Sequence, residues 1–258
     1  MGQNSNIQWT DSTFNPWWGC LKVSSECKFC YAEKWANRMG FDVWGSAQDT
    51  ERRFFGESHW TGPLKWDKQA KEQGKRIKVF CASMADIFEQ HPSLGEERLK
   101  VWRLIESTPN LDWQLLTKRP ENITTMIPVD WVTNPPDNVW YGTSIGEAST
   151  LWRLRALQQV PAKVRWLSCE PLIGPLGKLD LSGIHWVVAG GESGPLSKIR
   201  HTELNWILDI KSQCAKVGIP FFVKQLGALW ASENNANHSK GGDIVEWPTE
   251  LQIREFPE

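Results

Sequence analysis

The sequence has no apolar run long enough to cross a membrane. A membrane-spanning helix needs about 18 or more consecutive apolar residues, and no stretch of the 258 residues approaches that length. The N-terminal residues MGQNSNIQWTDSTF are polar and lack both the charged and the apolar region of a secretory signal. We therefore expect a cytoplasmic protein with no membrane partner.

The sequence also has no excess of charge. It contains 29 Lys and Arg and 30 Asp and Glu, for a formal net charge of −1. No global positive field therefore draws the protein toward nucleic acid. The local basic patches at 75–78 and 117–120, with 17 tryptophans, would suit a stacked base. We expect most of the tryptophans to be packing residues, because Trp is highly buried on average.

Two common catalytic motifs are missing. There is no G-x-S-x-G nucleophile elbow, so the sequence does not indicate Ser-His-Asp hydrolysis. The glycine-rich segment GGESG at 190–194 lacks the Lys-Ser/Thr pair of a P-loop, which excludes that class of nucleotide triphosphatase.

Cysteines are few but clustered. Six are too few to suggest a disulfide framework in a cytosolic chain of this length. Cys20, Cys27 and Cys30 fall within eleven residues, and thiolates so placed are typical ligands of zinc or an iron–sulfur cluster. Three local thiolates would leave one iron of a [4Fe–4S] cluster open for chemistry. Alternatively, the loop could bind zinc, with Cys81 or Cys169 as the fourth ligand.

Short apolar runs alternate with segments of helical periodicity. The helical segments are Gly95–Ser107, Thr150–Gln159 and Glu203–Val217, the last with Gly218 as its C-cap. This alternation predicts a parallel α/β fold. Our first choice is a single domain over residues 1–258, a partial TIM-like barrel of six to eight parallel strands, and a doubly wound sheet is the second. The expected strands are Ile7–Thr10 and the runs that begin at Lys78, Asp112, Asn138, Lys163, His185 and Pro220.

Each expected strand is followed by a polar turn. Catalytic groups of α/β barrels come from the carboxyl ends of the strands, so these turns are predicted to share one site. The turns are polar and contain Gly or Pro, and their candidate residues are Ser83, Asp86, Thr117, Lys118, Arg119, Thr143, Ser144, Glu147, Ser168, Glu170, Gly190, Gly191, Glu192, Lys224 and Gln225. The segment Asn234–Asp243 is expected to be a surface loop.

A cysteine loop after the first strand of an α/β barrel resembles the radical S-adenosylmethionine (radical SAM) superfamily. The resemblance implies that the open iron binds S-adenosylmethionine and that reductive cleavage yields a 5′-deoxyadenosyl radical. Tyr31 matches the aromatic residue near the adenine, and Ser83 and Asp86 would lie near the methionine moiety. The sequence departs from the superfamily in having six residues between its first two cysteines and in carrying Gly190-Gly191-Glu192 after the sixth strand instead of the second.

A closer resemblance covers nearly the whole chain. The segments IQWTDSTFNPWWGC, CKFCYAE, SMADIF, LLTKRPE, VWYGTSI, SCEPLIGP, GGESGP and FFVKQLG are similar to a phage-associated family of three-cysteine-motif proteins. After GGESGP this family tends to continue with Ala-Arg-Pro, whereas this chain reads LSKIRH and offers Arg200 as the replacement.

The leading hypothesis is a radical SAM enzyme. Its substrate is unknown, and nucleic acid modification or repair is the first class of reaction to test. The enzyme would need an external electron donor, and a partner protein could complete its site. The alternatives are a scaffold held by zinc or an iron–sulfur cluster, and an electron-transfer protein. Glu170 and Glu192 are candidate catalytic bases or turn caps, and Lys224 is a third catalytic candidate. The cofactor-binding candidates are Tyr31, Ser83, Asp86, Thr117, Lys118, Ser144, Gly190 and Gly191, and the metal ligands are Cys20, Cys27 and Cys30.

Overall fold

A computed structural model describes residues 2–257 of the chain. They form two compact units, which are described separately. Unit 1 comprises Met1–Val23, Ala32–Gly142 and Val160–Lys163, and unit 2 comprises Ser24–Tyr31, Thr143–Gln159 and Val164–Glu258. The chain thus passes from unit 1 to unit 2 inside the cysteine loop and returns to unit 1 at the start of helix α1.

Seven strands are hydrogen-bonded in the order in which they occur along the chain. Strands β1 to β3 pair in parallel in unit 1, and β5 to β7 pair in parallel in unit 2. A doubly wound sheet would reverse its order at a switch point, so the second choice of fold is wrong. The expected α/β fold, a partial TIM-like barrel of six to eight parallel strands, is confirmed in its strand number and order.

Six of the seven strands lie on the expected apolar runs. The N-terminal strand is a correction, because Ile7–Thr10 is a turn closed by a bond from the Thr10 N–H to the Ile7 carbonyl (3.2 Å). Trp9 in this turn is buried and packs on Phe80, so its apolar character reflects burial without a strand. The strands are β1 (Ser12–Thr13), β2 (Ile77–Cys81), β3 (Leu111–Thr117), β4 (Val139–Ser144), β5 (Val164–Cys169), β6 (Trp186–Gly190) and β7 (Phe221–Gln225).

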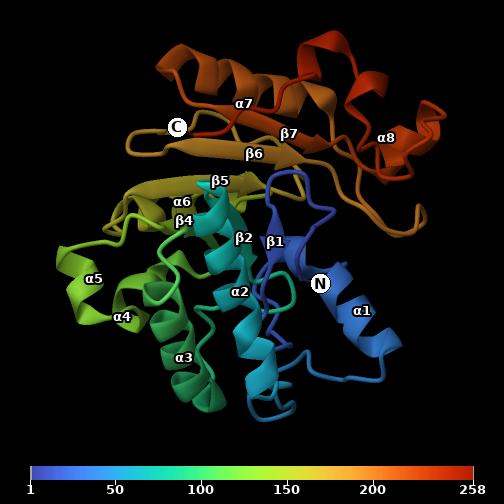
Figure 1. Cartoon of the computed structure of the whole chain (residues 1–258). Helices are drawn as coiled ribbons and strands as arrows, with labels where there is room; N and C mark the ends of the chain where they lie inside the picture. The colour runs from blue at the N-terminus through green and yellow to red at the C-terminus, as the bar shows by residue number, and fades with distance from the viewer. Residues whose placement is uncertain (1, 258) are drawn as a thin grey trace. The chain divides into compact units, whose positions relative to one another are not determined.

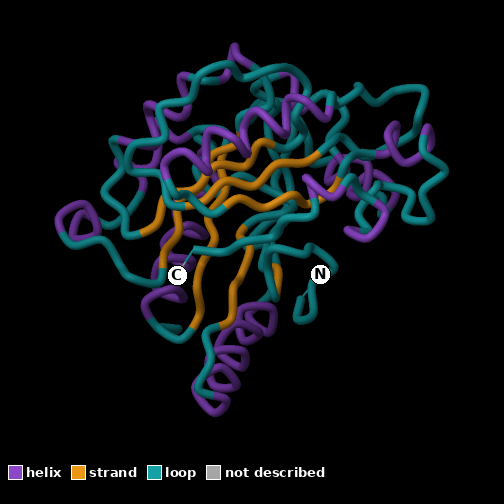
Figure 2. Tube along the Cα trace, turned by 90° about the horizontal axis from the view of Figure 1, so that it is seen from above, coloured by secondary structure: helices purple, strands orange, loops and turns teal. Residues whose placement is uncertain are grey.

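Helices and loops alternate with the strands along the chain (Figure 2). The three expected helices are confirmed as α3 (Gly95–Glu106), α6 (Trp152–Gln158) and α7 (Leu204–Val217), and Gly218 caps α7 with φ +71°. The longest helix, α2, was not expected, because it contains Gly62 and Pro63, residues that usually interrupt helices. The remaining helices are α1 (Tyr31–Arg38), α2 (Glu57–Gln73), α4 (Ile123–Met126), α5 (Val129–Thr133) and α8 (Ala228–Glu233).

Aromatic side chains fill the core of each unit. In unit 1, Phe14 meets Trp113 edge to face at 5.8 Å between ring centroids. In unit 2, Trp166 and Trp186 lie 5.4 Å apart, and α7 packs on β6 and β7 (Figure 1). Most of the tryptophans are buried, as expected of packing residues. Across residues 2–257, no helix has the length and apolar character needed to cross a membrane.

Candidate metal and cofactor site

The six cysteines fall into two groups that differ in exposure. Cys20, Cys27 and Cys30 are partly exposed, whereas the three outside the loop are fully covered, in β2, β5 and α7. Burial raises the pKa of these three thiols and that of Cys20 as well, so solvent access and not the thiol pKa separates the two groups. The donor set of the loop therefore fits a metal or cluster better than any set that includes Cys81, Cys169 or Cys214.

The backbone around Cys20 is held closely in unit 1. Cys20 and Trp44 form a bridge in parallel orientation, and Gly19 forms another with Ala85. Gly19 has φ +117°, and a Cβ at this position would lie 2.4 Å from the Val43 carbonyl oxygen. Only glycine fits here without a backbone shift, so the entry to the cysteine loop depends on this residue.

Arg119 connects Cys20 to a buried network of charges. Its Nη1 lies 3.7 Å from Cys20 Sγ and donates to Asp86 Oδ2 at 2.9 Å, while its Nη2 donates to the Leu21 carbonyl at 2.7 Å. Glu89 accepts from the Leu21 N–H at 2.8 Å and from both Nε and Nη2 of Arg52. Both polar groups of the Leu21 backbone are thus held by buried side chains.

The pKa of Cys20 reflects opposing influences. The pKa of Cys20 is raised to about 12, first by burial and then by the charge of Asp86, while the guanidinium of Arg119 acts in the opposite direction and lowers it. Arg119 is therefore the neighbour that favours the thiolate.

Asp86 joins the carboxyl ends of β2 and β3. It is buried and accepts from the Thr117 hydroxyl (2.6 Å) and the Lys118 N–H (3.0 Å), in addition to Arg119. The structure thus brings together three of the cofactor-binding residues predicted from the sequence. The fourth in this unit, Ser83, exchanges hydrogen bonds with the Asn15 side chain.

In unit 2, Glu26 anchors the segment Ser24–Tyr31, which carries Cys27 and Cys30. Its buried Oε1 accepts from the Gly146 N–H at 2.9 Å and from Arg153 Nη1 at 3.2 Å. Arg153 also donates to the carbonyl of Ser144, a predicted cofactor-binding residue at the end of β4. The segment is therefore tied to the carboxyl end of that strand.

Arg200 makes a second attachment for the same segment. It pairs with Glu192 through both carboxylate oxygens, donates to the Ser25 carbonyl at 2.9 Å and lies over the Phe29 ring at 5.4 Å. The carboxylate of Glu192, a predicted catalytic residue, is thus committed to an ion pair beside the cysteine segment.

The other two predicted catalytic residues lie together at the ends of β5 and β7. Lys224 Nζ is 3.0 Å from Glu170 Oε1, and the Ser168 hydroxyl donates to Glu170 at 3.4 Å. A Cβ on Gly190 would lie 2.9 Å from the same Glu170 oxygen, and one on Gly191 would lie 2.3 Å from the Leu226 carbonyl. Glycine at these two positions allows the Glu170 side chain and the Leu226 backbone to approach closely.

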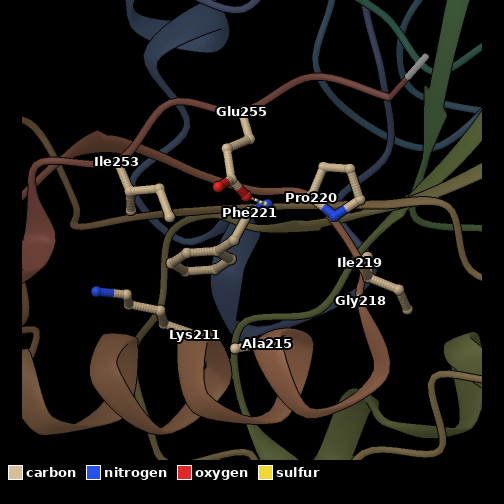
Figure 3. A pocket seen from close by; sticks show the side chains of 8 residues that line it. All are labelled: Lys211, Ala215, Gly218, Ile219, Pro220, Phe221, Ile253 and Glu255. Carbon is tan, nitrogen blue, oxygen red and sulfur yellow. Dashed lines mark hydrogen bonds between the residues drawn. The ribbon is translucent and has the colours of Figure 1, made fainter.

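A hollow elsewhere in unit 2 lies at the amino end of strand β7, away from the carboxyl ends that carry the candidate residues. Figure 3 shows it between helix α7 and the start of β7, where the Phe221 N–H donates to Glu255 Oε2 at 3.0 Å. Catalytic groups in α/β barrels lie at the carboxyl ends of the strands. We therefore assign this hollow no role in the site.

Among the residues that the structure describes, no three His, Cys, Asp or Glu side chains gather as a metal-binding group. Cys20 belongs to unit 1, and Cys27 and Cys30 belong to unit 2. The assignment of the three cysteines as one ligand set consequently rests on their spacing and their exposure.

Comparison with known proteins identifies a family. The profile of DUF5131, a protein of unknown function, matches residues 4–250. The chain belongs to the DUF5131 family. No curated protein matches this DUF5131 chain.

Solved structures of spore photoproduct lyase are similar to the DUF5131 chain. The lyase complexed with dinucleoside spore photoproduct is 12% identical, with TM-score 0.46 over 83% of this chain and 66% of that chain. A cysteine-to-serine mutant is 13% identical, with TM-score 0.49 over 84% of this chain and 64% of that chain. A further mutant, with bound AdoMet and the dinucleoside, is 12% identical with TM-score 0.46 over 83% and 66%. The match spans less than two thirds of each lyase chain, and scores this low carry no conclusion about what the DUF5131 protein binds.

Sequence reasoning missed the residues that support the cysteines. Arg119 appeared only as one of several polar residues after β3, and no local pattern singled out Glu89, Arg52, Glu26 or Arg153. Their partners lie 33 to 127 residues away, so no short-range signal could have identified them.

Proposed function

We propose that this DUF5131 protein is an iron–sulfur enzyme of the radical SAM type, with a [4Fe–4S] cluster held by Cys20, Cys27 and Cys30. The observation that carries the proposal is the division of the cysteines. The three thiols that lie within eleven residues are partly exposed, whereas the other three are buried. A bound cluster with one open iron would supply the electron that cleaves S-adenosylmethionine.

The protein's own groups would hold the two parts of the ligand loop, each part within its own unit. Arg119 and Glu89 fix the backbone next to Cys20, and Arg119 donates toward its sulfur. Glu26 and Arg200 fix the segment that carries Cys27 and Cys30. Support of this kind around metal ligands orients them and tunes the metal.

The predicted S-adenosylmethionine-binding residues keep that role in the proposal. Asp86 would act mainly by orienting Thr117, Lys118 and Arg119, since it accepts a hydrogen bond from each. Gly190 and Gly191 let the Glu170 side chain and the Leu226 backbone pack closely against them, and they keep a cofactor-binding role by the resemblance. By the resemblance, the remaining contacts are Tyr31, Ser83 and Ser144.

The acid–base candidates are the Glu170–Lys224 pair and Glu192. Lys224 Nζ lies 3.0 Å from Glu170 Oε1, so the two groups could act together on one bound substrate as acid and base. Glu192 is bound to Arg200 on both oxygens and so would position the loop.

The wider hypothesis concerns setting and substrate. We propose a cytoplasmic, single-domain enzyme over residues 1–258, of the phage-associated three-cysteine-motif type. It would act on nucleic acid with an external electron donor, and a partner protein would be needed if the isolated chain proves inactive. The competing function is a scaffold with structural zinc, which the three local thiolates favour less because structural zinc usually has four closed ligands.

The test is metal analysis of protein purified without oxygen. We expect roughly four irons and four sulfides per chain, as a [4Fe–4S] cluster requires. The electron paramagnetic resonance spectrum of the reduced protein should change when S-adenosylmethionine is added, with release of 5′-deoxyadenosine. Cys27→Ala should lose the iron, whereas Cys214→Ala, in the buried group, should retain it. One zinc per chain without iron would contradict the proposal of a radical SAM enzyme.

A further inference from the structure

We propose that the outer face of helix α1 binds single-stranded nucleic acid. This inference rests on the proposed function, since it names the substrate class of the same site. The surface consists of Tyr31, Lys34, Trp35 and Arg38, which we call the α1 stripe.

The α1 stripe follows from helix geometry. Its members occupy positions i, i+3, i+4 and i+7 of α1 and therefore share one face. The helix is anchored through Ala32 and Ala36, which are buried. Large aromatic rings consequently lie on the outside, with Tyr31 56% exposed and Trp35 48% exposed. Exposed aromatics separated by one helical turn are unusual in a chain whose tryptophans are mostly buried.

The charges that neighbour the α1 stripe in the sequence are complementary to phosphate. Between Cys20 and Gly40 the sequence has the cations Lys22, Lys28, Lys34 and Arg38 and only two carboxylates. Both carboxylates are paired within the chain, Glu33 with Lys22 at 2.6 Å and Glu26 with Arg153 at 3.2 Å. Although the net charge of the chain is −1, this segment is locally basic.

The mixture of rings and cations favours a nucleic acid over a protein partner. Charged residues are depleted at the core of protein–protein interfaces, whereas the α1 stripe places Lys34 and Arg38 on the same face as its two rings. Bases stack on aromatic side chains while cations follow the phosphates, without need of a particular sequence. Tyr31 directly follows Cys30 in the sequence and is also the proposed adenine contact, so the strand and S-adenosylmethionine would meet at this ring.

The experiment measures the affinity of the full chain for a fluorescein-labelled 20-nucleotide single strand, as DNA and as RNA, by anisotropy. Trp35→Ala should weaken binding about 5- to 100-fold, the range expected for loss of one stacked base. Arg38→Gln should weaken binding and lower the salt dependence by about one phosphate contact. The matched control is Trp152→Ala, which removes a tryptophan of the same exposure (48%) from α6 and should leave the affinity unchanged. Circular dichroism confirms that each variant is folded.

The inference is overturned if the parent chain binds neither strand, if it binds duplex DNA of the same sequence equally well, or if Trp35→Ala and Trp152→Ala behave alike. Sedimentation of the parent and of Trp35→Ala detects the competing occupant. A self-association that Trp35→Ala abolishes would assign the face to a second copy of the chain and would also overturn the inference. Iron is counted on the same samples. Strand binding without iron would leave the α1 stripe standing while the radical SAM proposal fails, and iron without strand binding would do the reverse.

Discussion

At the scale of single residues, Arg119 links the cysteine loop to a buried carboxylate. One guanidinium meets the sulfur of Cys20, the carbonyl of Leu21 and the carboxylate of Asp86. Its planar fork supports several hydrogen bonds in fixed directions, which lysine cannot reproduce. The residue therefore combines a structural role with an influence on the loop thiol.

Replacing Arg119 with Met should destabilise the protein by about 3–5 kcal/mol, because Asp86 would remain buried without its main cation. Urea denaturation followed by circular dichroism measures the loss. As a control, Lys68→Met removes an ion pair with Glu72 in which both side chains are exposed, and should cost about 1 kcal/mol or less. Equal losses in the two variants would show that Arg119 has no special role in folding.

Gly19→Ala should also be destabilising, by about 1–3 kcal/mol or more, because the residue has φ +117° and its Cβ would meet the Val43 carbonyl. In contrast, Gly95→Ala at the start of α3 meets no atom within 4 Å at φ −57° and should be neutral or slightly stabilising. Thermal unfolding of the two variants compares them directly, and an unchanged Gly19→Ala protein would refute the steric argument.

At the scale of elements, the segment Ser24–Tyr31 has little regular structure of its own. Its single 3-10 helix covers only Ser25–Cys27, and its position in unit 2 comes from Glu26 and Arg200. A ligand loop that is held by a buried ion pair and by Arg200 can present its thiols without a helix or strand beneath it.

Glu26→Gln should cost about 3–5 kcal/mol in the free energy of unfolding, since the buried Arg153 loses its carboxylate partner. Asp137→Asn breaks an exposed pair with Lys163 and should cost about 1 kcal/mol or less. Both values come from urea denaturation at neutral pH. A cost below about 1 kcal/mol for Glu26→Gln would mean that the segment is held by other contacts.

At the scale of the whole molecule, two histidines couple folding to pH. Burial lowers the pKa of His59, whose ring stacks between Phe14 and Phe55. Burial, with a smaller effect from Arg165, lowers the pKa of His185. Both side chains therefore take up a proton more readily in the unfolded chain than in the folded one.

Stability should consequently decline as the pH falls below about 6.5, the ordinary pKa of histidine, toward the lowered pKa values of the folded state. In that window the unfolded state binds more protons, so the free energy of unfolding decreases with falling pH. Urea denaturation from pH 7.5 to 5.5 measures the slope. The double variant His59→Gln, His185→Gln should show a flatter profile, and an unchanged slope would contradict the assignment.

Much of the fold was predictable because its signals are local. Near-continuous apolar runs mark strands covered on both faces, and six of the seven strands followed them. The errors were local as well. The buried Trp9 made a turn resemble a strand, and Gly62 and Pro63 concealed the longest helix.

The sequence by itself determined the cluster of three cysteines, the α/β alternation and the polar residues at the strand ends, because each is a pattern of neighbouring residues. Only the tertiary structure decided which of those polar groups are committed to one another. Asp86 with Arg119, Glu192 with Arg200 and Glu170 with Lys224 are such pairs. The burial of Cys81, Cys169 and Cys214 and the partial exposure of the loop cysteines were likewise decided by the tertiary structure alone. Burial and ion pairing depend on which distant segments pack together, and residue spacing along the chain does not encode that information.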